Sequence, residues 1–509
     1  MKFLPTLVFS LLTAAQLVQP ALAADKASAQ TAAIDWRKDN NVEAAFAAAK
    51  AANKPLFLYW GAVWCPPCNQ VKATIFNRQE FIDKSRHFIP VYLDGDSPGA
   101  QKYAAQFKVR GYPTMILFRP DGTELTRLPG EVDSERYLQV LTLALNSAAP
   151  VSETLKLALA GGKTLKADDW SLLADYSWDD PQQKLVPQKD IAATLSKLAE
   201  LAPAGLNATR LYLKSLYAQA GVKNAALDKA QATDKLIKAL SDVKVARDNL
   251  DLVAGSAAEL TEFLTASGSD SRHKLVTAWN AALQKLADDQ SISKTDRLGA
   301  VVAEIALAKL DGGKPTPALQ KEVQKRVGSI EQATTDSYER QSVVSSAAYA
   351  LGNAGLLDDS DNLLKAELKR SHSPYYFMST LGSNAKKRGD KAGAVNWYEQ
   401  AYNASKGPAT RLQWGSNYVV SLVDLTPADA PRIEKAVSSV FDEAGKTDTA
   451  FYERNRAYLE KMGKKLVEWN KDGKHQPVFA KVKSQLDGIC NKLPSGDPQK
   501  ASCQGLLKG

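Results

Sequence analysis

The feature that most constrains this 509-residue sequence is a pair of cysteines separated by two residues, Cys65 and Cys68. Residues 56–60 form a short apolar run just before the pair, which is typical of a buried strand. Residues 65–76 follow the pattern of a helix, so Cys65 is expected at a helix N-terminus. A Cys-x-x-Cys pair in this context predicts thiol–disulfide chemistry.

The positions of the two cysteines predict different roles. Unpaired N–H groups and the helix dipole favour a thiolate at a helix N-terminus, which makes Cys65 the expected nucleophile. Cys68, one turn later, can resolve a mixed disulfide that Cys65 forms with a substrate. Pro67 suits the first helical turn, but neither Pro66 nor Pro67 has an N–H to offer a thiolate.

A zinc site is the alternative interpretation of Cys65 and Cys68. Zinc usually requires four ligands in paired spacing, and the other two cysteines, Cys490 and Cys503, lie near the far end of the chain. The four histidines are isolated and are interpreted as surface or helix-packing residues: His87, His273, His372 and His475. Redox chemistry is therefore preferred, and no metal or organic cofactor is expected.

Cys490 and Cys503 enclose a turn-rich loop, residues 494–498. A bridge between them is expected to be structural and to staple the C-terminal tail, since catalytic pairs normally lie closer together or at a helix start. The alternative is a second redox pair that exchanges with Cys65.

Helices and strands are expected to alternate between about residues 34 and 147, as in a small α/β domain. The expected helices are 42–52, 65–76, 100–107 and 134–146, and the expected strands are 56–60, 88–93, 114–118 and 124–128.

This region resembles the thioredoxin superfamily, especially its exported members. Residues 61–68, Gly-Ala-Val-Trp-Cys-Pro-Pro-Cys, match the active-site motif of that family, and residues 111–114, Gly-Tyr-Pro-Thr, fall where it places a cis-proline loop. The resemblance implies that Pro113 is cis, that Tyr112 helps to dock substrate backbone, and that Trp64 supports the cysteine pair. Pro66 and Pro67 would support it as well.

One residue departs from the family pattern. Many thioredoxins carry a buried acid on the strand before the motif, where this chain has Tyr59. A tyrosine cannot accept a proton from Cys68 at neutral pH, so another group would have to do so.

From residue 150 onwards the sequence predicts helices. Gly355 and Gly389 are 34 residues apart, as are Pro374 and Pro408. This period of helix pairs resembles tetratricopeptide repeats, with the matching copies near residues 345–410. We therefore expect a signal peptide over 1–23, a thioredoxin-like domain over 24–149 and an all-α solenoid or bundle over 150–509.

An aromatic group in the repeat region has two interpretations. Its members are Trp397, Tyr398, Tyr402 and Trp414. Packing between helices is preferred, and a peptide-binding concave surface is the alternative.

The signal peptide is expected because Lys2 precedes an apolar run over 3–18, and small residues stand at 21 and 23, before a cut at Ala24. A membrane anchor is the alternative, but the run is shorter than the roughly 20 residues needed to cross a bilayer. The mature protein is thus expected to be exported to the periplasm without a membrane span. A net charge of +9, scattered among acids, does not argue for nucleic acid as a partner of an exported protein.

The sequence thus predicts a periplasmic thiol–disulfide oxidoreductase with exported, cysteine-containing protein substrates and an upstream redox partner. A reducing or isomerising role is expected, because nothing between Cys65 and Cys68 stabilises a thiolate strongly. The rival interpretation is a tetratricopeptide-like scaffold whose thioredoxin-like domain mainly binds partners.

Overall fold

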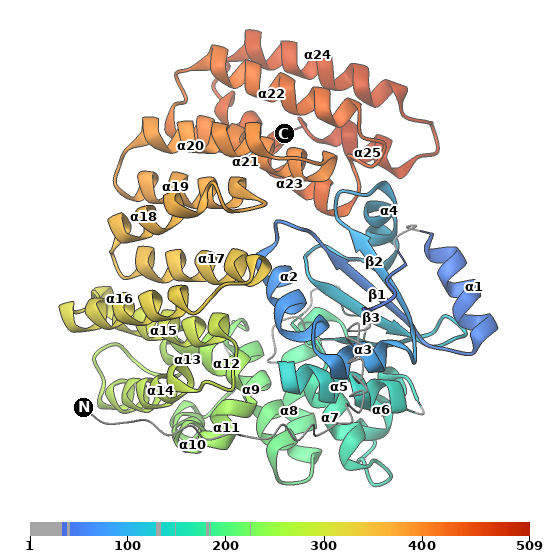
Figure 1. The fold of residues 1–509 in the computed structure, drawn as a ribbon, viewed down its shortest axis with the longest axis vertical. Coiled ribbons are helices and arrows are strands. Elements are labelled where there is room, and N and C mark those ends of the chain that lie inside the picture. The colour runs from blue at the N-terminus through green and yellow to red at the C-terminus, as the bar shows by residue number, and fades with distance from the viewer. Residues whose placement is uncertain are drawn as a thin grey trace, which may run out of the picture.

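The computed structural model describes residues 33–37, 41–128, 134–147, 149–179, 183, 185–223 and 225–508. The expected signal peptide lies outside the described residues. Figure 1 shows a small α/β domain beside a long array of helices that curves around one side of it.

The α/β domain contains a four-stranded sheet in the order β2-β1-β3-β4. β1 is parallel to β2 and antiparallel to β3, and β3 is antiparallel to β4. Its elements are α1 (Val42–Ala52), β1 (Leu56–Gly61), α2 (Pro66–Val71), a π-helical turn (Lys72–Phe76), α3 (Gln79–Ser85), β2 (Ile89–Asp94), α4 (Pro98–Phe107), β3 (Thr114–Phe118), β4 (Glu124–Leu128) and α5 (Ser134–Asn146).

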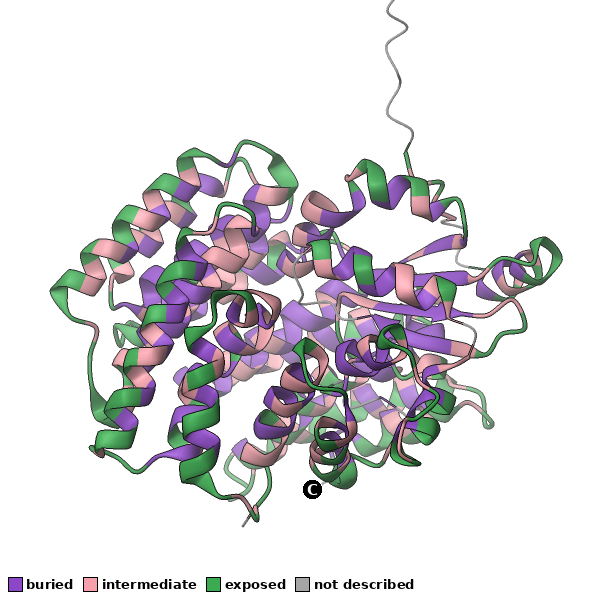
Figure 2. Ribbon diagram, turned by 90° about the horizontal axis from the view of Figure 1, so that it is seen from below, coloured by how far each residue is buried: buried purple, intermediate pink, exposed green. Residues whose placement is uncertain are grey.

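The central strand β1 is buried on both faces, which explains its unbroken apolar sequence. Leu56, Leu58 and Trp60 pack with α1 and α4, whereas Phe57 and Tyr59 pack with the π-helical turn, α3 and α5. Figure 2 shows the strands as a buried layer between these helices. The predicted α/β domain is confirmed.

Two details differ from the sequence prediction. The helix expected to run unbroken to residue 76 changes to a π-helical turn at Lys72, where the Thr74 hydroxyl donates to the Gln70 carbonyl at 2.8 Å. Helix α3 was not predicted, because it is short and its N-cap, Arg78, makes no side-chain capping bond.

After α5 the described residues contain helices and no further strand, as predicted. These helices, together called the helical region, are α6 (Val151–Leu159), α7 (Ala167–Asp175), α8 (Ile191–Leu201), α9 (Leu206–Ala220), α10 (Lys229–Ser241), α11 (Val243–Asp248), α12 (Leu250–Gly255), α13 (Ala257–Leu264), α14 (Asp270–Asp288), α15 (Lys294–Ala308), α16 (Pro317–Gln332), α17 (Ser337–Asn353), α18 (Leu357–Glu367), α19 (Pro374–Lys387), α20 (Lys391–Ala404), α21 (Pro408–Leu425), α22 (Ala430–Gly445), α23 (Glu453–Trp469), α24 (Gln476–Lys492) and α25 (Pro498–Gly505).

The 34-residue spacing noted in the sequence corresponds to helix pairs. Gly355 and Gly389 have φ values of 87° and 81° and form the turns between α17 and α18 and between α19 and α20. Pro374 and Pro408 each begin the next helix, α19 and α21.

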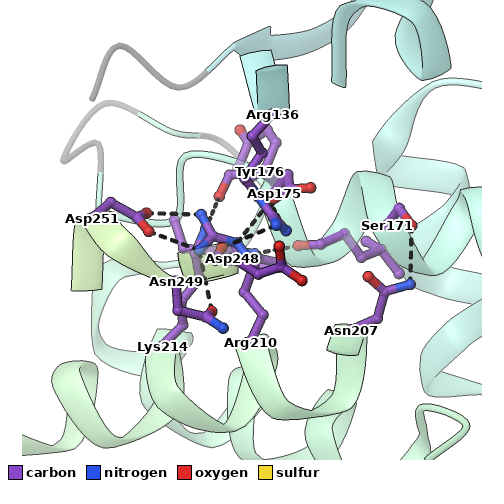
Figure 3. A network of polar contacts seen from close by, with 12 residues as sticks. Arg136, Ser171, Asp175, Tyr176, Asn207, Arg210, Lys214, Asp248, Asn249 and Asp251 are labelled. Atoms are coloured by element: carbon purple, nitrogen blue, oxygen red, sulfur yellow. Dashed lines mark hydrogen bonds and ion pairs between the residues drawn. The ribbon is translucent and has the colours of Figure 1, made fainter. Parts of the chain in front are cut away.

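A buried ion network joins the last helix of the α/β domain to the helical region (Figure 3). Arg136 of α5 and Arg210 of α9 both pair with Asp175, at 2.7 and 2.6 Å. Arg210 also forms a two-bond pair with Asp251, at 2.8 and 2.9 Å. Burial alone would raise the pKa of Asp251, but the charge and hydrogen bonds of Arg210 lower it to about 2.

The helical region ends in a covalent staple. Cys490 near the end of α24 forms a disulfide with Cys503 in α25, as predicted. Among the described residues, no helix has both the length and the apolar character needed to cross a bilayer.

Candidate functional site

Cys65 and Cys68 form a disulfide at the start of α2. Cys65 is the N-cap residue, and its sulfur accepts the Cys68 N–H at 3.2 Å. Pro66 and Pro67 fill the first helical positions and donate no backbone hydrogen bond there. The cysteine residues are only 3% and 0% exposed.

The predicted cis-proline loop lies beside this pair. The bond between Tyr112 and Pro113 is cis, and the Tyr112 carbonyl oxygen lies 3.6 Å from Cys65 Sγ. The Tyr112 ring packs so closely on Gly95 that a Cβ there would come within 2.5 Å of it. A glycine at this position therefore allows the loop to approach the cysteine pair.

Trp64, the residue before the pair, is covered by the helical region, which the sequence did not predict. The covering side chains, here called the helical cover, are Tyr375, Thr410, Trp414 and Arg454. The Trp64 indole N–H donates to Thr410 Oγ1 at 2.7 Å, and its ring meets that of Trp414 edge-on, with centroids 6.3 Å apart. Trp64 is only 6% exposed as a result.

Asp96, on the loop after β2, binds the N-terminus of α21 in the helical region. Its carboxylate accepts the Thr410 N–H and the Thr410 hydroxyl, both at 2.6 Å. Burial raises the pKa of Asp96, and the two bonds from Thr410 oppose that rise. Gly407 has a φ of 92°, and a Cβ there would lie 2.3 Å from the Asp96 carboxyl carbon.

Arg454 completes the helical cover. Its guanidinium carbon lies 4.8 Å from the centre of the Trp64 ring and 4.9 Å from that of Tyr112. The preceding residue, Glu453, pairs with Arg110 of the α/β domain at 3.3 Å. The two regions thus meet at both the tryptophan and the cis-proline loop.

The rim of the motif makes further contacts with the helical region. The Val63 carbonyl oxygen lies 2.9 Å from Asn69 Nδ2 and 2.9 Å from Nε2 of His372, an exposed side chain. Gln70 of α2 donates to Ser293 and Asp296 at the start of α15. His372, interpreted from sequence as a surface or packing residue, therefore lies beside the motif.

Tyr59 occupies the buried position predicted for it. Burial, followed by the charge of Asp94, raises the pKa of its phenol far above the usual value. The hydroxyl stays protonated at neutral pH and has no hydrogen-bond partner among the described residues. Tyr59 is therefore no substitute for an acid that accepts a proton.

The fold brings together most of the residues singled out from the sequence. Five of them surround the cysteine pair: Trp64, Pro66, Pro67, Tyr112 and Pro113. Sequence reasoning missed Asp96, Thr410 and Arg454, which belong to no motif. Thr410 is 346 residues from Trp64 and 314 residues from Asp96, and Arg454 lies farther along the chain still.

Comparison with known proteins agrees with this geometry. Residues 42–145 match the model of a thioredoxin-like domain. A stretch of 120 residues is 27% identical to the thiol:disulfide interchange protein DsbD of Pseudomonas fluorescens, covering 23% of this chain and 21% of that protein. A stretch of 97 residues is 31% identical to the TPR repeat-containing thioredoxin TDX of Arabidopsis thaliana, covering 19% of this chain and 24% of that protein. The chain therefore matches about a quarter or less of each relative, and the match supports a thioredoxin-like domain beside a largely helical region.

Proposed function

We propose that this protein is an exported thiol–disulfide oxidoreductase that acts on protein thiols through Cys65 and Cys68. The observation that carries the proposal is the position of this disulfide, at the start of α2 and beside the cis Tyr112–Pro113 loop of a thioredoxin-like domain. The name of one relative, a thiol:disulfide interchange protein, supports the same chemistry.

The reaction follows from the roles of the two sulfurs. With the pair reduced, the Cys65 thiolate attacks a client disulfide, forms a mixed disulfide and releases one client thiolate. Cys68 then loses its proton and attacks the Cys65 sulfur, which releases the second client thiolate. Two electrons pass to the client, and the pair becomes a disulfide. A second protein with a dithiol would return the pair to its reduced form.

The direction proposed is reduction or isomerisation of client disulfides. Within the motif, the Cys65 sulfur accepts only the N–H of Cys68, because Pro66 and Pro67 have none. A strong oxidant of this class requires a thiolate that is stabilised much more than the motif alone provides. A reduction potential near that of a dedicated oxidant, about −120 mV, would contradict the proposed direction.

The proposed location is the periplasm, because residues 1–23 have the pattern of a signal peptide. Its partners would be exported proteins with cysteines and the redox protein that renews the pair. Nucleic acid is not a proposed partner.

The helical region is proposed to hold the client or the redox partner. Since the helical cover packs on Trp64 and leaves Cys65 only 3% exposed, a client would reach Cys65 after the cover separates from Trp64. The contact of the cover with the site consists of hydrogen bonds, ring contacts and the Arg110–Glu453 ion pair, and neither disulfide joins the two regions.

Two assays test the proposal. Wild-type protein should reduce insulin in the presence of a dithiol, and Cys65→Ser should not. Cys68→Ser should trap client proteins as mixed disulfides on Cys65, which mass spectrometry can identify. Equal, negligible rates for wild type and Cys65→Ser would instead favour a scaffold that binds partners through its thioredoxin-like domain.

A further inference from the structure

A buried arginine of the helical region lies against Trp64 and Tyr112, two residues that flank the redox pair. Arg454 belongs to the first turn of α23 and is only 7% exposed. Its guanidinium carbon lies 4.8, 4.9 and 5.0 Å from the ring centres of Trp64, Tyr112 and Tyr458. A cation at such distances is attracted by the ring faces, and the attraction is stronger where water is excluded.

Arg454 forms no ion pair with a carboxylate among the described residues, and its charge lowers the pKa of Asp96 only as a minor cause beside burial and the bonds from Thr410. The Nη2 of Arg454 donates to the neutral side chain of Gln413. Buried charges in proteins are normally paired, so an arginine held by rings and an amide is unusual. The charge of Arg454 can therefore act on an anion that forms nearby during the reaction.

The acids around this contact are engaged elsewhere. Asp96 accepts two bonds from Thr410, and Glu453 pairs with Arg110 at 3.3 Å. Asp94, the last residue of β2, accepts from the Tyr92 hydroxyl at 2.9 Å. The remaining titratable groups that face Arg454 are the phenols of Tyr112 and Tyr458.

Arg454 contacts the residues on both sides of Cys65. Trp64 precedes Cys65 in the chain, and the Tyr112 carbonyl oxygen lies 3.6 Å from the Cys65 sulfur. Burial raises the pKa of Tyr112 to about 12, and the charge of Arg454 opposes that rise. The charge is therefore felt at the loop that touches Cys65.

We infer that Arg454 is a positioning residue for the redox reaction: its charge stabilises the thiolate that Cys65 carries once the disulfide is reduced. This inference rests on the proposed function and deepens it, because the helical region then sets the reactivity of a pair in the other region. When a dithiol protein reduces the pair, two electrons convert the disulfide to a Cys65 thiolate and a Cys68 thiol, and the donor dithiol becomes a disulfide. Arg454 stabilises the thiolate product of that step.

The direct test is the pKa of Cys65 in the full-length reduced protein. Thiolate absorbance near 240 nm is followed against pH, with reduced Cys65→Ser as the background. Arg454→Met keeps the aliphatic stem and removes the charge, so the pKa of Cys65 should rise by about one unit. Arg454→Lys should restore most of the wild-type value, and Arg454→Gln provides a second uncharged side chain should the Met variant fold poorly.

Arg110→Met is the matched control. Arg110 is a cation at the same contact, but it is paired with Glu453 and its side chain is 54% exposed. Its loss should leave the pKa of Cys65 unchanged. An unchanged pKa in both folded uncharged variants of Arg454, or an equal rise in Arg110→Met, would overturn the inference.

Equilibration with glutathione separates this inference from the proposed function. Arg454→Met should shift the equilibrium about tenfold toward the Cys65–Cys68 disulfide, because one pKa unit corresponds to a tenfold change. A wild-type pair that does not exchange with glutathione would contradict the proposed function, and the pKa comparison in chemically reduced protein would still decide the role of Arg454.

Discussion

The two disulfides of this chain are equally buried but differ in what buries them. The four cysteines are at most 3% exposed. Cys65–Cys68 lies at a helix start, and Trp64 beside it is covered by Thr410 and Arg454 of the helical region, with 346 residues between Trp64 and Thr410. Cys490–Cys503 connects consecutive helices, α24 and α25, inside the region to which it belongs.

Burial alone therefore does not distinguish the proposed reactive disulfide from the one expected to be structural. Both disulfides belong to one hydrophobic cluster, but Cys65–Cys68 lies where the two regions meet, so separating the helical cover from Trp64 would expose it. Exposure of Cys490–Cys503 requires α24 and α25, two helices of one region, to separate from each other. The two pairs should therefore respond differently to mutation and reduction.

The largest expected difference is in activity. Cys65→Ser should reduce the rate of disulfide exchange to the uncatalysed rate, because it removes the attacking thiolate. The double variant Cys490→Ser/Cys503→Ser should retain the wild-type rate at temperatures where it stays folded. Insulin turbidity or a fluorescent dithiol substrate reports both rates. Loss of activity in both variants would show that the second pair takes part in exchange.

Stability should depend more on the ion network of Figure 3 than on the redox pair. Asp251→Ala leaves the buried Arg210 with one fewer partner, so the free energy of unfolding should fall by about 3 kcal/mol. Urea denaturation of wild type and Asp251→Ala measures this change in the free energy of unfolding.

The same variant has a predictable pH dependence. The pKa of Asp251 is about 2 in the folded protein, below the usual carboxyl value, so its stabilisation is present above pH 3.8 and is lost as the pH falls toward 2. The difference in the free energy of unfolding between wild type and Asp251→Ala should therefore decrease over that pH interval. A difference that stays constant with pH would contradict the assignment.

Removal of the structural disulfide should have a similar or smaller effect. Cys490→Ala/Cys503→Ala opens a loop of 13 residues, and the chain-entropy model predicts a loss of about 3 kcal/mol. Thermal denaturation measures the change. Cys65→Ala/Cys68→Ala opens a much shorter loop, so its loss of stability should be smaller, and the opposite order would contradict the different roles assigned to the two disulfides.

The smallest expected effect concerns the helical cover. Thr410→Val removes the acceptor of the Trp64 N–H, and if this weakens the contact by about 1 kcal/mol, dithiothreitol should reduce Cys65–Cys68 about fivefold faster. Thr447→Val is the matched control, because the Thr447 hydroxyl, just after the end of α22, donates to the Glu443 carbonyl of that helix and not to Trp64. Equal rates in wild type and Thr410→Val would mean that the cover does not limit access.

The sequence predicted the parts of this molecule that local patterns determine. The apolar run of β1, the cysteine pair at a helix start and the Gly-Tyr-Pro-Thr loop each depend on a few neighbouring residues, and the structure places them as expected. Helix α3 was not predicted from the sequence, because it is short and lacks a capping side chain.

The helical cover could not be predicted for a different reason. Thr410 and Arg454 lie on ordinary amphipathic helices, and nothing in their local sequence distinguishes them from other helix-surface residues. Their contacts with Trp64 depend on how the helical region curves around the domain, which no short pattern encodes. The prediction that nothing stabilises the Cys65 thiolate considered only the motif, and Arg454 lies outside it.

A redox titration of both cysteine pairs in one full-length protein tests whether Cys65–Cys68 cycles while Cys490–Cys503 stays oxidised. The protein is equilibrated in glutathione buffers, quenched with acid, alkylated in denaturant and analysed by mass spectrometry. Cys65–Cys68 should be reduced with a midpoint between about −180 and −270 mV, while Cys490–Cys503 should stay oxidised to below about −300 mV. Reduction of both pairs at one potential, or a Cys65–Cys68 pair that resists reduction as strongly as the staple, would contradict the account.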